Sequence, residues 1–163
     1  MIHEVKGNLL ESSCQFICHQ VNCQGKMGSG IARSIREKWP KVYKNYIAKF
    51  NSLPEHIDGN VFLGNIQIVP LYDEYYSVKE HKYVINLFAQ DEYGYDGKRY
   101  TSYDAFWMCL GNISQTVPKG SSIGFPKNIG CCRGGANWNV IKIMIEETLG
   151  RDYEVYIFEY NGG

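Results

Sequence analysis

The hydrophobic and polar positions of this chain alternate between strand-like and helix-like spacing. Short apolar runs predict strands at 2–6, 16–21, 82–89, 121–125 and 153–159, and the β-rich stretch 61–72 contains a Gly-Asn turn signal. Apolar residues at helical spacing predict four helices. Ile31, Ile35 and Trp39 mark the first helix, and the second runs from Pro40 through Phe50. The third runs from Tyr103 through Val117, and Trp138, Ile141, Ile145 and Leu149 mark the fourth. Asn137 is a plausible N-cap for the last of these helices.

Strands interleaved with helices are typical of an α/β fold, with a largely parallel sheet buried under helices on both faces. No linker, repeat or low-complexity stretch divides the 163 residues, so the sequence predicts a single domain over 1–163.

Composition narrows the function classes. Lys and Arg together number 17, as do Asp and Glu, and this zero net charge predicts that there is no extended nucleic-acid surface. We expect no signal peptide and no membrane span, because the N-terminus lacks a basic region before an apolar stretch and no apolar run is long enough. A cytoplasmic protein is therefore predicted.

The cysteines and histidines do not predict a metal site. There is no Cys-x-x-Cys pair, and the four histidines do not have zinc spacing. We expect reduced, mostly buried thiols, no metal and no cofactor. The six cysteines are Cys14, Cys18, Cys23, Cys109, Cys131 and Cys132.

A first glycine-rich loop, HQVNCQGKMGSGIARSI (19–35), joins a predicted strand to a predicted helix. This geometry presents backbone N–H groups to an anion at a helix N-terminus. The Walker A frame is absent, because Met27 follows Lys26, and the dinucleotide fingerprint is absent, because Arg33 replaces its third glycine. Taken alone, the glycines are equally consistent with a packing turn.

A second glycine-rich loop, IGFPKNIGCCRGGANW (123–138), again joins a strand to a helix. Parallel sheets bind ligands at the carboxyl ends of their strands, so two such loops are expected to converge on one crevice. Converging loops suit a diphosphate with groups on either side, and they indicate a nucleotide-like ligand.

Four segments resemble the macrodomain family: VKGNLL (5–10), ICHQVNCQG (17–25), MGSGIA (27–32) and IGCCRGGANW (129–138). The resemblance runs from about 5 to 158 and is closest to the ADP-ribose-1''-phosphate processing branch. It implies a three-layer α/β/α fold with a central mixed, mostly parallel sheet. It also implies that the partner is ADP-ribose or ADP-ribose-1''-phosphate, with ADP-ribosylated protein as a further possibility.

The resemblance implies a set of ligand-binding residues. The diphosphate lies between the two loops, and the distal ribose lies beside Asn22 and Gly25. The loop residues concerned are Met27, Gly28, Ser29, Gly30 and Ile31 on one side and Gly130, Cys131, Cys132, Arg133 and Gly134 on the other.

The adenine end departs from the family pattern. Most macrodomains have an aspartate that accepts a hydrogen bond from the adenine amino group, where this chain has Asn8. An amide oxygen also accepts such a bond. Leu9 is expected to supply backbone contacts, and Phe158 either packs on adenine or belongs to the core.

The catalytic groups are less well defined. The glycohydrolase branch uses a lysine after the strand 82–89 and an aspartate in the second loop, but this chain has Gln90 and Gly134 there. His19 suits proton transfer near neutral pH, as in the phosphatase branch, but a histidine on an apolar strand is more often a hydrogen-bonded structural residue. Asp91 and Asp96 are candidate acids in a polar segment after a central strand, and Lys98, Arg99 and Tyr100 are candidates for holding a phosphate.

The sequence thus predicts a hydrolase that binds ADP-ribose or a derivative and removes a group, most simply a 1''-phosphate, from the distal ribose. Two alternatives stay open. The first is a binding module without turnover, and the second is an ADP-ribosyl hydrolase acting on modified macromolecules.

Overall fold

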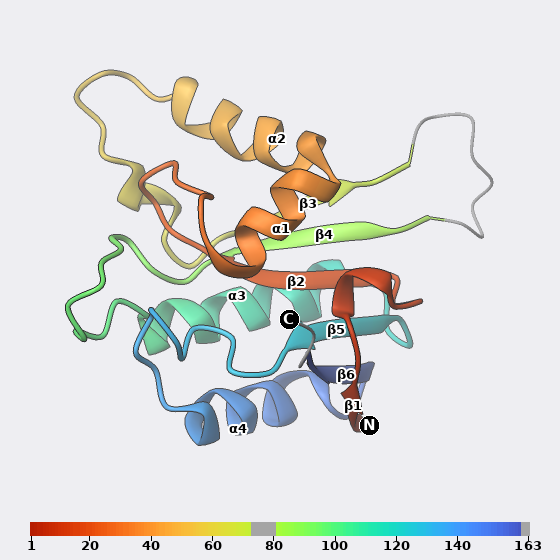
Figure 1. Ribbon diagram of the computed structural model, residues 1–163. Coiled ribbons are helices and arrows are strands. Elements are labelled where there is room, and N and C mark those ends of the chain that lie inside the picture. The colour runs from red at the N-terminus through yellow and green to blue at the C-terminus, as the bar shows by residue number, and fades with distance from the viewer. Residues whose placement is uncertain (73–80, 161–163) are drawn as a thin grey trace.

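A computed structural model describes residues 1–72 and 81–160, and its six strands form one sheet in the order β1-β6-β5-β2-β4-β3 (Figure 1). Every neighbouring pair is parallel except β3 and β4, which are antiparallel. The strands are β1 (Ile2–Lys6), β2 (Phe16–Val21), β3 (Ile66–Pro70), β4 (Tyr83–Phe88), β5 (Ser122–Pro126) and β6 (Glu154–Glu159).

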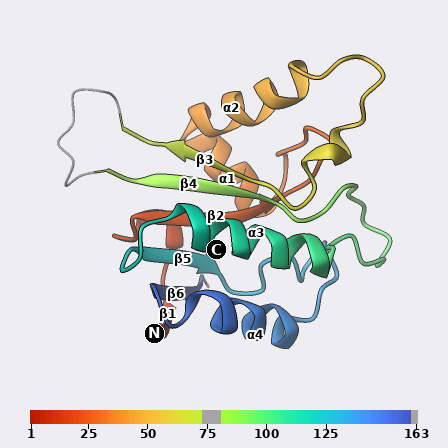
Figure 2. The same ribbon diagram turned by 180° about the vertical axis from the view of Figure 1, so that it is seen from behind.

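Four helices cover the two faces of this sheet. Helices α1 (Gly30–Lys38) and α2 (Pro40–Asn51) lie on the face that is nearer the viewer in Figure 1, and α3 (Tyr103–Thr116) and α4 (Trp138–Leu149) lie on the opposite face, which Figure 2 brings to the front. The predicted three-layer α/β/α fold is therefore confirmed. Two short 3₁₀ helices, η1 (Leu9–Glu11) and η2 (Gly59–Phe62), complete the described elements.

The alternation of side chains along β2 divides the interior into two cores. Phe16 and Cys18 point into the core beneath α3 and α4, whereas Ile17 and Val21 point into the core beneath α1 and α2. Because β2 is central and covered on both faces, its apolar residues run almost without interruption.

The stretch 61–72 differs from its prediction as a continuous β-rich segment. Its first residues belong to η2, which begins where the Asp58 carboxylate accepts a hydrogen bond from the Asn60 N–H at 2.9 Å. Gly64, at φ +91°, then turns the chain into β3. The Asp58 cap and the glycine turn explain why strand geometry starts only at Ile66. Residues 71 and 72 lie beyond the end of β3.

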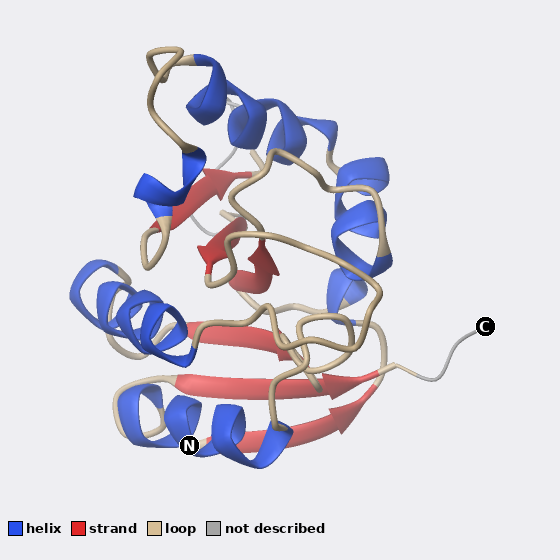
Figure 3. Ribbon diagram, turned by 90° about the vertical axis from the view of Figure 1, so that its left-hand side faces the viewer, coloured by secondary structure: helices blue, strands red, loops and turns tan. Residues whose placement is uncertain are grey.

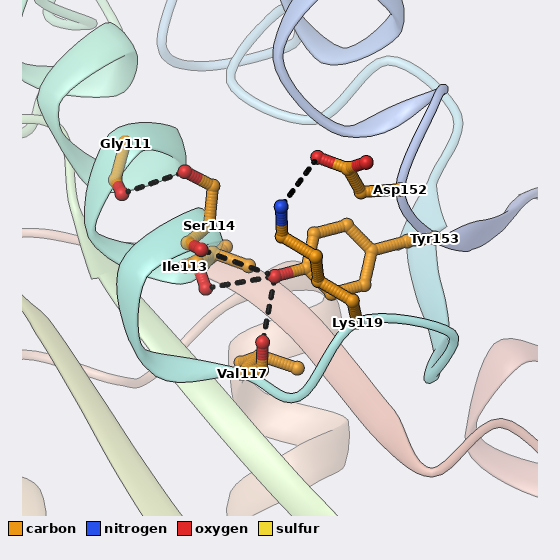
Figure 4. Close-up of polar contacts among 7 residues, drawn as sticks. All are labelled: Gly111, Ile113, Ser114, Val117, Lys119, Asp152 and Tyr153. Atoms are coloured by element: carbon orange, nitrogen blue, oxygen red, sulfur yellow. Dashed lines mark hydrogen bonds and ion pairs between the residues drawn. The ribbon is translucent and has the colours of Figure 1, made fainter.

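A buried tyrosine directly before β6 joins this part of the chain to the end of α3 (Figure 4). Tyr153 is 2% exposed, and its hydroxyl donates a hydrogen bond of 2.6 Å to the Val117 carbonyl, just beyond the end of α3. The carbonyls of Ile113 and Ser114 lie 3.4 Å away. The Ile113 carbonyl also accepts a hydrogen bond from the Val117 N–H at 2.8 Å, whereas the Ser114 and Val117 carbonyls lie at the end of the helix, where intrahelical partners are lacking.

Tyr153→Phe is expected to lower the free energy of unfolding by about 1–2 kcal/mol, because it leaves a buried carbonyl without its donor. Urea unfolding monitored by circular dichroism measures the change. Tyr156→Phe is the matched control, since its hydroxyl makes no hydrogen bond to any described residue. Equal stability of Tyr153→Phe and wild type would contradict this role.

Candidate functional site

Three loops meet at one edge of the sheet because three adjacent strands are parallel. β2 lies between β5 and β4, so the loops that leave the carboxyl ends of these strands emerge side by side. They comprise residues 22–29, 89–102 and 127–137. Figure 3 looks onto this edge and shows the loops crossing the ends of the strands.

The loops enclose a crevice of about 690 Å³. Many of the predicted ligand-binding residues line it: Asn22, Gly25, Met27, Gly28, Ser29, Gly30, Ile31, Gly130, Cys132, Arg133 and Gly134. The structure thus brings both glycine loops to one cavity, with the loop after β4 contributing a third wall.

Asn22 holds the first loop in shape. Its Oδ1 accepts hydrogen bonds from the Gln24 N–H at 3.0 Å and from the Tyr46 hydroxyl at 2.9 Å, and its Nδ2 donates to the Lys26 carbonyl at 2.8 Å. Burial raises the pKa of Tyr46, so its hydroxyl stays protonated and remains a donor. Asn22 therefore lines the crevice while its side chain braces residues 22–26.

Both glycine loops leave main-chain N–H groups free. Within the described part of the chain, the N–H groups of Gly28 and Ser29 donate no hydrogen bond, nor do those of Cys132, Arg133 and Gly134. Ser29 occupies the N-cap of α1 but its side chain makes no capping bond, so the first turn of that helix is also open. Free N–H groups on two sides of a cavity favour an anionic ligand.

The charged side chains of the crevice have the same preference. Lys26, Arg36, Lys127 and Arg133 line it, and none of its described lining residues is acidic. The Lys127 ammonium lies 3.4 Å from the Glu159 carboxylate, and the Arg133 guanidinium lies 4.5 Å from the centre of the Tyr95 ring. The Arg133–Tyr95 contact also joins the loop after β4 to the loop after β5.

A polar cluster beneath the crevice explains two of its glycines. Gln20 Nε2 donates to Gln90 Oε1 at 2.7 Å and to Thr101 Oγ1 at 2.8 Å, and the Thr101 hydroxyl donates to the Gly130 carbonyl at 2.7 Å. A Cβ on Gly130 would lie 2.7 Å from Gln20 Oε1, and one on Gly134 would lie 2.2 Å from Thr101 Oγ1. Only glycine allows the second loop to approach this cluster so closely.

His19 lies outside the crevice and is fully buried beneath α1 and α2. Its Nε2 is hydrogen-bonded to Asn86 Oδ1, Asn86 Nδ2 donates to Gln67 Oε1 at 3.0 Å, and Gln67 Nε2 donates to the Asn45 carbonyl at 2.9 Å. Because Asn86 uses its Nδ2 on Gln67, its oxygen faces the histidine, and Nε2 carries the proton. His19 Nδ1 has no partner among the described residues.

This environment favours the structural interpretation of His19 over the catalytic one. Burial lowers the pKa of His19 to about 4, against the opposing effect of the Asn86 hydrogen bond. The imidazole is therefore neutral at pH 7, and it serves as a link in a polar ladder across β2, β4 and β3. The sequence shows a histidine on an apolar strand, but it does not show that the histidine faces away from the loops.

Neither of the two candidate acids is among the residues that line the crevice. The Asp91 carboxylate accepts a hydrogen bond from Gln24 Nε2 at 2.9 Å, and Asp96 accepts one from the Tyr100 hydroxyl at 2.8 Å. The Tyr100 hydrogen bond, with a further one from the Lys98 N–H, lowers the pKa of Asp96. Asp91 directly follows the crevice residue Gln90, whereas Asp96 belongs to a separate exposed cluster with Lys98 and Tyr100.

Four predicted ligand residues do not line the cavity. Asn8 Oδ1 accepts a hydrogen bond from the Leu10 N–H at 3.0 Å and so caps η1, while Leu9 is buried. Phe158 packs against the core beneath α1 and α2, which is the second of the two roles that the sequence left open for it. The Cys131 thiol is turned toward the Ile129 carbonyl, and its exposed neighbour Cys132 faces the cavity instead.

The crevice also contains residues that sequence reasoning did not single out. Gln20, Tyr43, Tyr93 and Tyr95 line it, as do Lys26, Arg36, Lys127 and Asn128. The signal for Gln20 is its position at the end of a central strand, and Tyr93 and Tyr95 lie in a segment that the sequence placed near the crevice. Nothing in the local sequence around Arg36 and Tyr43 indicates a place in the crevice, because they reach it only through the packing of two helices.

No group of three or more His, Cys, Asp or Glu side chains in the described ranges is arranged to hold a metal ion. All six cysteines are free thiols, and Cys14, Cys18, Cys23 and Cys109 are buried. None of the described helices combines the length and apolar character that crossing a membrane requires.

Comparisons with known proteins bear on the fold and on the site. No protein-family model matches the chain. A DNA ADP-ribosyl glycohydrolase of Thermus aquaticus is 25% identical over 161 residues, covering 98% of this chain and 41% of that protein. An ADP-ribose 1''-phosphate phosphatase of Scheffersomyces stipitis is 36% identical over 76 residues, covering 43% of each. The chain thus spans about two fifths of the length of the curated relatives it matches.

Among solved structures, the macrodomain of Thermus aquaticus DarG superposes with a TM-score of 0.72 at 23% identity, covering 98% of both chains. At this identity the likeness concerns the fold.

The free energy of unfolding is expected to fall as the pH is lowered from about 6.5 to about 4. In this range the unfolded chain binds a proton at His19 that the folded chain, with its lowered pKa, does not bind. The contribution from this residue is about 2 kcal/mol between pH 7 and pH 5. Urea unfolding at both pH values measures it. His19→Gln keeps an N–H donor without a titrating group, and an unchanged pH dependence in this variant would contradict the assignment.

Proposed function

We propose that this chain, which has the macrodomain fold, binds ADP-ribose in the crevice between its two glycine loops. The observation that carries the proposal is the set of free N–H groups on both loops. The cavity between the loops is lined by four basic side chains, and none of its described lining residues is acidic. The diphosphate lies between Gly28 and Ser29 on one side and residues 132–134 on the other. Its two negative charges match both donor sets.

The dimensions of the crevice support a ligand of this size. Its volume of about 690 Å³ falls within the range of about 300–1,000 Å³ for small-molecule sites. The distal ribose is placed beside Asn22 and Gly25, near the cluster of Gln20 and Gln90. The relatives support the same ligand, because the names of the two curated proteins both refer to ADP-ribose linkages.

Gly28→Glu is expected to weaken ADP-ribose binding at least a hundredfold, because it puts a carboxylate beside the diphosphate. Gly28 suits this test better than Gly30, since Gly30 has φ +59° and any replacement there strains the backbone. Gly28 has no such constraint, and a Cβ added to it meets no atom within 4 Å. Calorimetric titration with ADP-ribose measures the affinity.

Gly111→Glu is the matched control, because a Cβ at Gly111 also meets no atom within 4 Å and the residue lies in α3, away from the crevice. Its ADP-ribose affinity should equal that of wild type. Unchanged affinity in Gly28→Glu would exclude this placement of the diphosphate.

We further propose that the bound ligand is hydrolysed at the distal ribose, with ADP-ribose-1''-phosphate as the substrate. The curated relatives support hydrolysis, since one is named a phosphatase and the other a glycohydrolase. The phosphatase reaction is preferred because Gln90 and Gly134 replace the lysine and aspartate of the glycohydrolase branch. In this reaction water adds to phosphorus, the bond from phosphorus to the ribose oxygen breaks, and that oxygen takes a proton.

Asp91 directly follows Gln90, which lines the crevice, and its carboxylate is held against Gln24 of the first glycine loop. Its single side-chain hydrogen bond, from Gln24, leaves acceptor positions free for a water molecule. We assign it the role of positioning and deprotonating the attacking water.

Asp91→Asn is expected to reduce phosphate release from ADP-ribose-1''-phosphate at least tenfold while ADP-ribose affinity stays unchanged, because an amide is not a base. A phosphate-release assay beside calorimetry separates these effects. His19→Gln should release phosphate at the wild-type rate, and dependence on His19 would reverse the two assignments. ADP-ribose binding by wild type without any phosphate release would make the chain a binding module.

A further inference from the structure

The free N–H groups of the second glycine loop lie on a short segment that is fixed at both of its ends. Gly130 and Gly134 bound this segment. The Gly130 carbonyl accepts a hydrogen bond from the Thr101 hydroxyl at 2.7 Å. The Gly134 carbonyl accepts hydrogen bonds from the N–H groups of Tyr100 and Thr101, at 2.8 and 2.9 Å. Both ends of the segment are therefore bonded to the loop after β4.

Thr101 is bonded to both ends of this segment, through its hydroxyl at Gly130 and through its N–H at Gly134. The residue is 2% exposed, and it does not itself line the crevice. Its hydroxyl also accepts a hydrogen bond from Gln20 Nε2 at 2.8 Å. A buried hydroxyl that both donates and accepts in this way is held in one orientation.

The backbone around Thr101 is firmly anchored. The next residue, Ser102, is the N-cap of α3, and its hydroxyl accepts a hydrogen bond from the Ala105 N–H at 3.1 Å. The Ser102 N–H donates to the carbonyl of Ala89, directly after β4, at 2.8 Å. Thr101 therefore connects the second glycine loop to the end of a central strand and to the start of a helix.

The middle of the segment is ordered only weakly by its own side chains. Cys132 and Arg133 are exposed, and the contact of Arg133 with Tyr95 lies at the surface, since Tyr95 is 73% exposed. Exposed contacts of this kind contribute little. Gly130, at φ +73°, adds the conformational freedom of glycine to one end. The order of the segment therefore depends on its bonds to the loop after β4.

We propose that Thr101 is a positioning residue for the anion site. Its hydroxyl holds residues 130–134 in the conformation in which the N–H groups of residues 132–134 are free to meet the diphosphate. The consequence for affinity rests on the proposed ADP-ribose site. Donors that are already in place when the ligand arrives need less ordering on binding, so that more of the interaction free energy appears as affinity.

Thr101→Val removes the hydroxyl and nearly keeps the shape of the side chain. The fold is expected to tolerate this change, because neither former partner is left without a hydrogen bond. The Gly130 carbonyl keeps the Ala136 N–H at 3.0 Å, and Gln20 Nε2 keeps Gln90 Oε1 at 2.7 Å. Circular dichroism and urea unfolding check that the variant is folded.

Two measurements on Thr101→Val test the proposal. The first is the NMR order parameter of the N–H groups of residues 132–134 in the ligand-free protein, which is expected to fall from about 0.85, typical of rigid backbone, to below about 0.6. The second is calorimetric titration with ADP-ribose. The Kd is expected to rise about tenfold, the effect of losing one hydrogen bond's net contribution.

Two further variants serve as controls. Thr101→Ser keeps the hydroxyl and should match wild type in both measurements. Thr148→Val makes the same chemical change elsewhere, because the Thr148 hydroxyl donates to the Met144 carbonyl at 2.7 Å. Thr148 lies near the end of α4 that is farther from the second glycine loop, so this variant should also match wild type.

Three results would overturn the proposal. The first is an unchanged order parameter in Thr101→Val. The second is a lowered order parameter with wild-type affinity, which would mean that the order of the segment does not control binding. The third is equal weakening by Thr101→Ser and Thr101→Val, which would exclude the hydroxyl as the cause. A wild-type protein that binds no ADP-ribose would contradict the proposed function instead, and the order parameters would still decide the role of Thr101.

Discussion

Parallel pairing of β2 with both of its neighbours is the constraint on which the candidate site depends. Because β5, β2 and β4 run in the same direction, their three following loops leave the sheet at one edge. An antiparallel β2 would send its glycine loop to the opposite edge, where no second loop could face it. The crevice is therefore a consequence of strand direction, and the glycines adapt its walls to an anion.

The register of β2 against its neighbours is in turn secured within the core. His19, Asn86 and Gln67 form a polar ladder on one face of β2, β4 and β3, and their strand register places each opposite the next. A slip of one residue would turn these side chains to the other face and leave several buried polar groups without partners. The ladder thus gives the alternative registers a high free-energy cost. Apolar side chains alone would distinguish the registers less strictly.

The sequence predicted the layers, the strand and helix order and the convergence of the two glycine loops, because these follow from local spacing and from the geometry of parallel sheets. It did not predict what long-range contacts decide. His19 looks available on a strand, yet its neighbour across the sheet is Asn86. Asn8, which the resemblance places at the adenine, caps η1 through a local hydrogen bond from the Leu10 N–H, which the sequence analysis did not consider. Arg36 and Tyr43 reach the crevice only because α1 and α2 fold back on each other.

Arg36 lines the crevice and also a second cavity, of about 530 Å³, between α1 and α2, so the two cavities are not independent. Two separate anions that share one guanidinium weaken each other, and thermodynamic linkage requires that the effect be equal in both directions. A single molecule that carries both anionic groups avoids most of this loss, because its second group arrives at a high effective concentration. The shared arginine therefore favours one connected ligand over a mixture of its parts.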